Sequence, residues 1–344
     1  MQQAVQPRIR EVWAQNLHEE FRVIRDVIET HPYIAMDTEF PGVVARPIGN
    51  FKTMSEYHYQ TMRCNVDLSK LVQVGFTLAD ENGDYSPEGS TWQFNFRFSV
   101  NEDMYSPEFV DLLQKSGIDL FRHEEMGIAP GDFAELMISS GMVLTEDTKW
   151  ISFHGGYDFG YFLRVLTGES LPVSEDKFWE VLHIWFPTVY DTRYILNQFK
   201  PSTSKGLSLN DMCEELGIHR IGNAHQAGPD SLLISDAFFK LRERYSPEGF
   251  DHREFNGKMF GFGQTATVTN GLTDPGRGGA TMAEREDRMT MREVHNQTPG
   301  PQNQGVSIGL QLQAGIPTQI PPTQYGPMGA NGPPYLRTSL VGGR

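Results

Sequence analysis

The sequence contains very little cysteine, with only Cys64 and Cys213 among 344 residues. The two residues do not form a C-x-x-C pair, so neither a disulfide-linked scaffold nor a zinc ribbon is expected. Long apolar runs are lacking as well, because no uninterrupted stretch reaches the ~18 residues of a membrane-spanning helix. The first residues, MQQAVQPRIREVW, include no apolar segment of the secretory type. We therefore expect a soluble protein of a reducing compartment.

Positive charge is scarce too. The chain has 29 Lys and Arg residues against 44 Asp and Glu residues, which gives a formal net charge of −15. This excess excludes a protein that holds nucleic acid through a general basic surface. If the partner is nevertheless a polyanion, a local feature of the binding site must offset the negative field of the protein.

The charge and the aromatic residues are distributed unevenly along the chain. Residues 263–344 contain 14 Gly, 9 Pro and 8 Gln but only two aromatic residues, and their net charge is +1. Such a composition is typical of disordered sequence. Residues 1–262 hold the other 37 aromatics and a net charge of −16, and a chain of that size can bury one large core. We expect one folded domain over 1–262 and a disordered Gly/Pro/Gln-rich tail over 263–344.

Short apolar segments separated by turns indicate the elements of the folded part. Apolar residues recur at three- and four-residue intervals over 8–30, which predicts a long helix that ends before Pro32. An Asn-Gly turn between two strand-like runs is typical of a hairpin. Farther along, strand-like runs alternate with helices, so the order predicts a mixed α/β sheet with helices on its faces. Strands are expected at 33–40, 71–79, 91–98, 149–153 and 186–190, and later helices at 157–167, 209–216 and from 229 onward.

Two acidic residues lie close together in the first of these strands. Asp37 and Glu39 are two positions apart, so their side chains project from the same face. At the end of a buried strand the two charges would repel and lose solvation, unless one takes up a proton or a cation lies between them. A strand end in water, with both acids simply solvated, is the ordinary alternative for this common pattern.

A third acid, Asp158, lies in the segment FHGGYDFG, where a strand turns into a helix. Functional groups collect at such strand ends in α/β folds. A carboxylate stabilised by the helix dipole is the alternative interpretation.

His225 and Asp230 have a His-x4-Asp spacing at the start of the last helix. Pro229 suits the first helical turn, which also places Asp230 in that turn and His225 on the preceding loop. A single histidine of this kind is usually structural, but the whole set of residues is much more specific than its parts.

The order of these residues resembles the signature of the DEDD exonucleases, in the branch that carries a histidine near the fourth acid. The four acids are, in chain order, Asp37, Glu39, Asp158 and Asp230, and His225 stands five residues before the last. A closer resemblance covers most of residues 8–262 and is to the Caf/Pop-type catalytic subunit of the Ccr–Not deadenylase complex. It is carried by the segments 36–42, 116–119 with His123, 153–160 and 225–233. Gly155 stands where relatives usually have serine, and Pro229 precedes the fourth acid, but neither departure removes a catalytic group.

The resemblance implies a ribonuclease H-like fold, a poly(A) substrate, hydrolysis from the 3′ end and 5′-AMP as product. It also implies two divalent ions, Mg²⁺ or Mn²⁺. On this basis we expect Asp37 to bridge the two ions, Glu39 and Asp230 to bind the ion that activates water, and Asp158 to bind the other. His225 is expected to act as the general base.

The resemblance also implies single-stranded RNA, a Not-type scaffold subunit and a second deadenylase with leucine-rich repeats as partners, and a place in the cytoplasm and nucleus. Two alternatives remain at this point. One is a DEDD-type exonuclease acting on other RNA or DNA 3′ ends, and the other is a scaffold subunit with a nuclease-like fold. The presence of all four acids and the histidine argues against a pure scaffold.

Other residues are weaker candidates for the site. Asp191 is expected to cap the following helix rather than to bind metal. Phe40 is expected to be a core aromatic, although it could lie near the terminal base. Lys200 and Lys205 flank a polar loop and could contact phosphates, but a solvated loop charge is the usual case.

Overall fold

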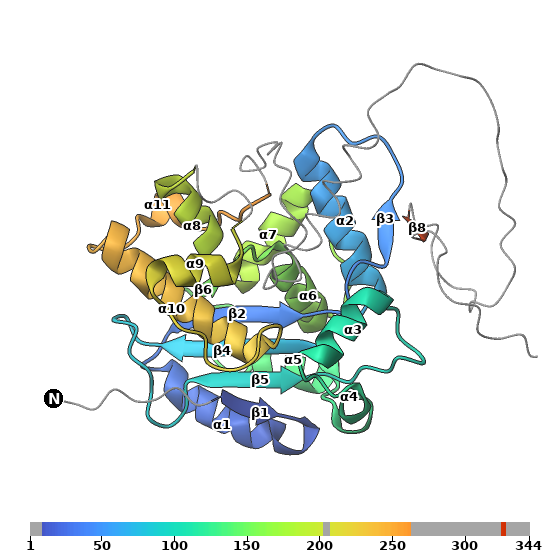
Figure 1. Ribbon diagram of the computed structural model, residues 1–344, viewed down its shortest axis with the longest axis horizontal. Coiled ribbons are helices and arrows are strands. Elements are labelled where there is room, and N and C mark those ends of the chain that lie inside the picture. Colours follow the sequence, from blue (N-terminus) through green and yellow to red (C-terminus); the bar gives the residue numbers. More distant parts are fainter. Residues whose placement is uncertain (1–8, 202–206, 263–324, 328–344) are drawn as a thin grey trace, which may run out of the picture.

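The computed structural model describes residues 9–201, 207–262 and 325–327. A six-stranded sheet lies at its centre, with the strand order β1-β5-β4-β2-β6-β7. All neighbouring pairs are parallel except those of β4, which runs opposite to β5 and β2 (Figure 1). The strands are β1 (Ile9–Val12), β2 (Tyr33–Glu39), β4 (Gln73–Ala79), β5 (Thr91–Asn95), β6 (Lys149–Ser152) and β7 (Val189–Asp191).

Helices cover both faces of this sheet. On one face α10 (Ala227–Tyr245) lies across β2 and β4 and packs with α8 and α9 (Figure 1). On the other face α1, α5 and α6 contribute to the larger part of the core. The remaining bounds are α1 Leu17–Ile28, α2 Met54–Leu68, α3 Pro107–Lys115, α4 Leu120–Met126, α5 Pro130–Ile138, α6 Gly156–Thr167, α7 Glu175–Trp185, α8 Thr192–Phe199, α9 Leu209–Leu216 and α11 His252–Phe255, with a short 3-10 helix at Ala14–Asn16.

The alternation of side chains along β2 divides the core into two apolar clusters. Ile34 and Met36 belong to the cluster shared with α1, α5 and α6. Ala35 belongs to the second cluster, which α8, α9 and α10 cover. Asp37 and Glu39 continue the Ala35 face, so they project toward the α10 side of the sheet.

The start of α10 lies unusually close to the sheet at Gly75. A Cβ atom at Gly75 would lie 1.9 Å from the carbonyl oxygen of Ala227, so no larger residue fits there. The first N–H groups of a helix have no partners within the helix. Here the side-chain oxygens of Gln73 and Gln93 accept from the N–H groups of Ala227 and Gly228, at 3.3 and 2.9 Å. The sheet itself therefore caps α10 and fixes the position of its first turn.

The expected mixed α/β sheet with flanking helices is confirmed, and so is the hairpin-like pairing of β4 with β5. The single helix expected over 8–30 is wrong in its first part, because Ile9–Val12 form strand β1 and the helix begins at Leu17. Ile9 and Val12 are three positions apart, a spacing typical of a helix, so the local pattern does not reveal this strand. Parallel pairing with Thr91–Phe94 of β5 decides between the two.

The disordered tail expected over 263–344 lies outside the described residues, apart from Tyr325–Pro327. These three residues form strand β8, which pairs antiparallel with β3 (Ala45–Pro47). Cys64 and Cys213 are both buried and form no disulfide, as expected. Across the described ranges, no helix is both long and apolar enough to cross a lipid bilayer.

Replacement of Gly75 tests the close contact between α10 and the sheet. We expect Gly75→Ala to lower the free energy of unfolding by about 1–3 kcal/mol, because the added methyl group displaces the Ala227 backbone. Gly131→Ala is the matched control, since nothing lies within 4 Å of a Cβ atom there. Urea unfolding of both variants measures the difference. Equal midpoints for the two would contradict the close approach.

Candidate active site

Asp37 and Glu39 occupy the carboxyl end of β2, where the parallel strands β6 and β7 also end. Both side chains are buried, with exposed fractions of 5% and 2%. In the neighbouring strand β4, Asp37 pairs with Gly75 and Glu39 with Gln73. The lack of a side chain at Gly75 leaves space on this face, which the first turn of α10 occupies.

Asp158 reaches the same region from the first turn of α6. It is buried, and its Oδ1 atom accepts a hydrogen bond of 2.5 Å from the Thr38 hydroxyl. Thr38 lies between the two acids of β2 but projects toward the opposite face. Because of this bond, β2 directly fixes the position of Asp158.

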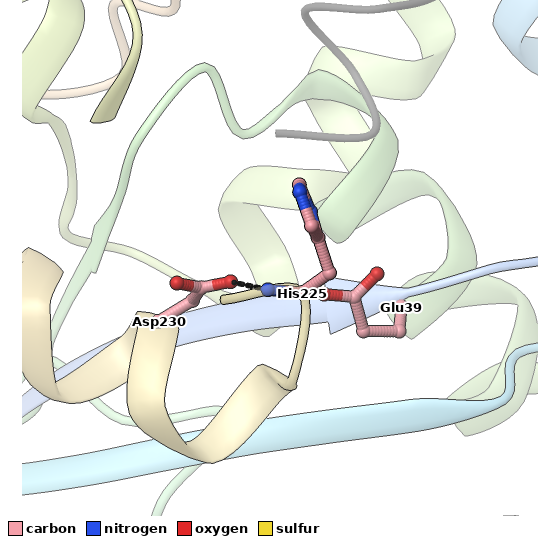
Figure 2. Close-up of side chains that lie close together, drawn as sticks. All are labelled: Glu39, His225 and Asp230. Carbon is pink, nitrogen blue, oxygen red and sulfur yellow. Dashed lines mark hydrogen bonds between the residues drawn. The ribbon is translucent and has the colours of Figure 1, made fainter. Parts of the chain in front are cut away.

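His225 and Asp230 come from the loop before α10 and from its first turn. The backbone N–H of His225 donates to Asp230 Oδ2 at 3.1 Å (Figure 2). The other oxygen, Oδ1, forms an ion pair with Arg220, whose guanidinium also donates to Asn210 Oδ1. His225 has a backbone φ of +62°, a strained value for a non-glycine residue of the kind that clusters at functional sites.

Figure 2 shows three of these side chains gathered between β2 and α10. One possible ligand atom from each of Glu39, His225 and Asp230 lies within 4.8 Å of the other two. Asp37 and Asp158 are not part of that close cluster, but Asp37 interacts with the charges of Glu39 and Asp230 in it and with that of Asp158. Burial first, and then the negative charges of Asp158, Asp230 and Glu39, raise the pKa of Asp37 well above its usual value.

Burial also raises the pKa values of the other two aspartates. It raises the pKa of Asp158 to about 7, although the Thr38 hydroxyl opposes the shift. It raises the pKa of Asp230 as well, against the opposing charge of Arg220. Carboxylates that are costly to ionise in this way are stabilised either by protons or by a bound cation. Oxygen ligands suit hard divalent cations such as Mg²⁺, so this donor set fits such ions chemically.

All five residues that the sequence singled out lie in one buried region of the structure. Asp191 caps α8, as expected, through Arg193 and Tyr194 N–H groups. Phe40 is a core aromatic that stacks against both Tyr157 and Tyr161.

Lys200 and Lys205 are the two candidates for contact with phosphates. Lys200 forms an ion pair with Glu215, and Lys205 lies outside the described residues.

Sequence reasoning missed the groups that hold the acids. Thr38 has a local signal, since it stands between Asp37 and Glu39. Arg220 and Asn210 carry no such signal, because the pairing of Arg220 with Asp230, and its bonds to Asn210, depend on how the loop before α10 packs on α9. Gln73 and Gln93 could have been suspected as polar residues within strands, but not as caps of helix N–H groups 154 and 135 residues away.

Comparison with known proteins identifies the family of this chain. Residues 12–129 and 140–238 match the CAF1 family ribonuclease. The chain belongs to this family. The family resemblance seen in the sequence motifs is thereby confirmed.

Several members of the CAF1 family are similar over most of the chain. Poly(A) ribonuclease pop2 of Schizosaccharomyces pombe is 44% identical over 325 residues, which cover 94% of this chain and 90% of that protein. The probable CCR4-associated factor 1 homolog 10 of Arabidopsis thaliana is 45% identical over 76% of this chain and 96% of its own length.

Solved structures of CAF1-family proteins show the same fold. The structure of S. pombe Pop2p in its Mg²⁺- and Mn²⁺-bound form superposes with a TM-score of 0.71 at 50% identity, and covers 74% of this chain and 99% of that chain. CAF1 co-crystallised with the yeast NOT1 MIF4G domain superposes with a TM-score of 0.61 at 32% identity, and covers 74% and 96%.

The raised pKa of Asp158 predicts how the stability of the metal-free protein depends on pH. The unfolded chain releases this proton near pH 3.9 and the folded protein near 7, so the proton stabilises the folded state fully at about pH 4 and no longer does so above about pH 7. With EDTA present, we expect this group to lower the thermal midpoint progressively from about pH 4 to about pH 7, with no further fall above that range.

Asp158→Asn should reduce this pH dependence, because the amide does not titrate, although Asp37 and Asp230 still contribute. Asp111→Asn is a suitable control, since the Asp111 side chain is 60% exposed on α3. A fall in midpoint of the same size in Asp158→Asn and the parent protein would contradict the assignment.

Proposed function

We propose that this chain is a poly(A)-specific 3′→5′ exoribonuclease, which shortens mRNA poly(A) tails and releases 5′-AMP. The observation that carries the proposal is the convergence of four buried acids and His225 from β2, α6 and α10. Further support comes from the relative named poly(A) ribonuclease, which is similar over 94% of this chain. Residues 1–262 form the catalytic domain, and residues 263–344 are an extension that the reaction does not need.

The site residues divide into metal ligands and a base. Asp37, Glu39, Asp158 and Asp230 hold two divalent ions, Mg²⁺ or Mn²⁺, which supply an activated water and stabilise the leaving 3′-oxygen. Asp37 interacts with the charges of the other three acids and is therefore assigned as the shared ligand. Glu39 and Asp230 lie on the His225 side, and Asp158 serves the other ion. The Mg²⁺- and Mn²⁺-bound structure of Pop2p supports this choice of ions.

His225 takes the proton from the attacking water. Its ring stands beside Glu39 and Asp230, so a proton accepted there remains next to negative charge. Imidazole is the side chain that most often serves as a general base at neutral pH, so the residue type suits this task. The strained backbone at His225, held by the N–H bond to Asp230, directs the ring from the loop.

The working protein is expected to act within a Ccr–Not complex in the cytoplasm and nucleus. A yeast CAF1 has been co-crystallised with the NOT1 MIF4G domain, and plant relatives are named as CCR4-associated factors. A Not-type scaffold and a second deadenylase with leucine-rich repeats are therefore the proposed partners. A subunit that binds RNA would compensate for the net negative charge of the catalytic domain.

Substitutions at the site test the proposed activity. With Mg²⁺ and 5′-labelled oligo(A), the parent protein should yield a ladder of progressively shorter products. Asp37→Asn should abolish the ladder, because the shared ligand loses its charge, and His225→Ala should slow it by about 10²–10⁴-fold. Circular dichroism and Asp111→Asn control for folding and for loss of an acid elsewhere. Full activity of Asp37→Asn would exclude the assignment.

The same assay separates the proposal from its alternatives. Oligo(U) and oligo(dA) of equal length should be shortened much more slowly than oligo(A). Equal rates on all three would favour a general DEDD-type exonuclease. No hydrolysis of any of them, by protein that binds Mn²⁺ normally, would favour a scaffold.

Truncation tests the domain boundary. A chain that ends after Phe262 should keep its activity on oligo(A) within about twofold, because none of the site residues lies beyond that point. A chain that ends after Gly257 removes the buried side chains of Met259 and Phe262, each worth about 2–5 kcal/mol. Thermal unfolding should therefore show a lower midpoint for the shorter chain only. A loss of activity in both chains would contradict the boundary.

A further inference from the structure

Asp191, at the end of β7, joins three separate segments of the chain through its buried carboxylate. The side chain has no solvent exposure. Its Oδ1 atom accepts from the N–H groups of Arg193 and Tyr194 at 2.9 and 3.1 Å, and these two bonds form an ordinary helix cap. Capping accounts for only part of what this carboxylate contacts.

Three further N–H groups donate to the same carboxylate from outside α8. The N–H of His154 donates to Oδ1 at 3.1 Å, and that of Gly155 donates to Oδ2 at 3.3 Å. The N–H of Phe260, near the end of the folded domain, donates to Oδ2 at 3.1 Å. Hydrogen bonds to an ionised acceptor are about twice as strong as neutral ones, so this carboxylate holds its surroundings firmly.

The segment that Asp191 holds is the turn between β6 and α6, which leads directly to Asp158. His154 has a φ of +62° in this turn, a conformation that persists only when the surroundings impose it. Gly155 is the N-cap residue of α6 and has no side chain that could cap the helix. The turn therefore depends on a distant carboxylate for its shape.

Residues near the end of the domain enclose the turn from the other side. A Cβ atom at Gly156 would lie 2.1 Å from the Phe262 ring, so that ring packs directly on the turn. The Arg193 guanidinium lies 4.3 Å from the centre of the Phe260 ring and 2.8 Å from His154 Nδ1. These contacts keep water away from the bonds of Asp191.

We infer that Asp191 is a positioning residue for Asp158, which rests on the metal-binding role proposed above for Asp158. Its carboxylate fixes the turn between β6 and α6 and thereby sets where Asp158 stands relative to Asp37. Loss of the bonds to Gly155 and Phe260 allows this turn to relax. The consequence is weaker binding of the divalent ion on the Asp158 side, with little change in the contacts that recognise RNA.

Asp191→Asn separates this role from helix capping. Asparagine is a good N-cap and keeps one acceptor oxygen for Arg193 and Tyr194. Its NH₂ group replaces Oδ2 and cannot accept from Gly155 or Phe260. Asp119→Asn is the matched control, because exposed Asp119 also caps a helix, α4, by accepting from two backbone N–H groups.

The experiment measures Mn²⁺ affinity by calorimetry, without substrate, and then kcat and KM on oligo(A) at increasing Mg²⁺. For Asp191→Asn we expect Mn²⁺ affinity about 10–100-fold weaker, a lower kcat with unchanged KM, and partial recovery of kcat at high Mg²⁺. Asp119→Asn should match the parent protein in all of these. All measurements are made well below each thermal midpoint. Should the asparagine variant not fold, Asp191→Ser replaces it. Serine keeps an oxygen that can cap α8, but its side chain is too short to reach the other two segments, so we expect the same loss of Mn²⁺ affinity and of kcat.

A lower thermal midpoint with unchanged Mn²⁺ affinity and unchanged kcat would overturn the inference and leave Asp191 as a helix cap only. The positioning role and the proposed function fail in different ways. If the parent protein does not shorten oligo(A) but Asp191→Asn still weakens Mn²⁺ binding, the positioning role stands and the proposed function does not.

Discussion

Repulsion among four buried carboxylates at the end of β2 is the constraint on which the rest of this structure depends. Asp37 meets the negative charge of three other acids at a place from which water is largely removed, and its pKa rises accordingly. Such a group of acids opposes folding unless protons or cations neutralise it. A divalent ion bound there would relieve the repulsion and would also provide the chemistry of a ribonuclease.

Two of the four acids, Asp158 and Asp230, are held by contacts from other parts of the chain. Thr38 of β2 donates to Asp158, the backbone N–H of His225 donates to Asp230, and Arg220 pairs with Asp230 from the opposite side. The first turn of α10 is in turn tied to Gln73 and Gln93 of the sheet. The acids therefore keep their mutual distances against repulsion, as a site that binds metal needs them to.

The net negative charge of the protein bears on how a nucleic acid can bind to it. A folded domain with a net charge of −16 repels a polyanion at most points of its surface. Several of its acids are concentrated at one buried place, where a bound cation would reverse the local field. Productive contact with a nucleic acid would then be confined to a phosphate that enters the site. Partner subunits would supply any further binding to RNA.

The sequence by itself determined the fold class and singled out the five candidate residues that the fold brings into one buried region. The two-residue period of a strand places Asp37 and Glu39 on one face, and the turn and proline signals place Asp158 and Asp230 at helix starts, because these are local properties of the backbone. Only the tertiary structure decided that Ile9–Val12 form a strand, and which groups support the acids. Thr38 and Asp158 are 120 residues apart, and Asp191 reaches residues 154 and 260. Contacts of that range depend on how the whole sheet and its helices pack, and no local pattern encodes them.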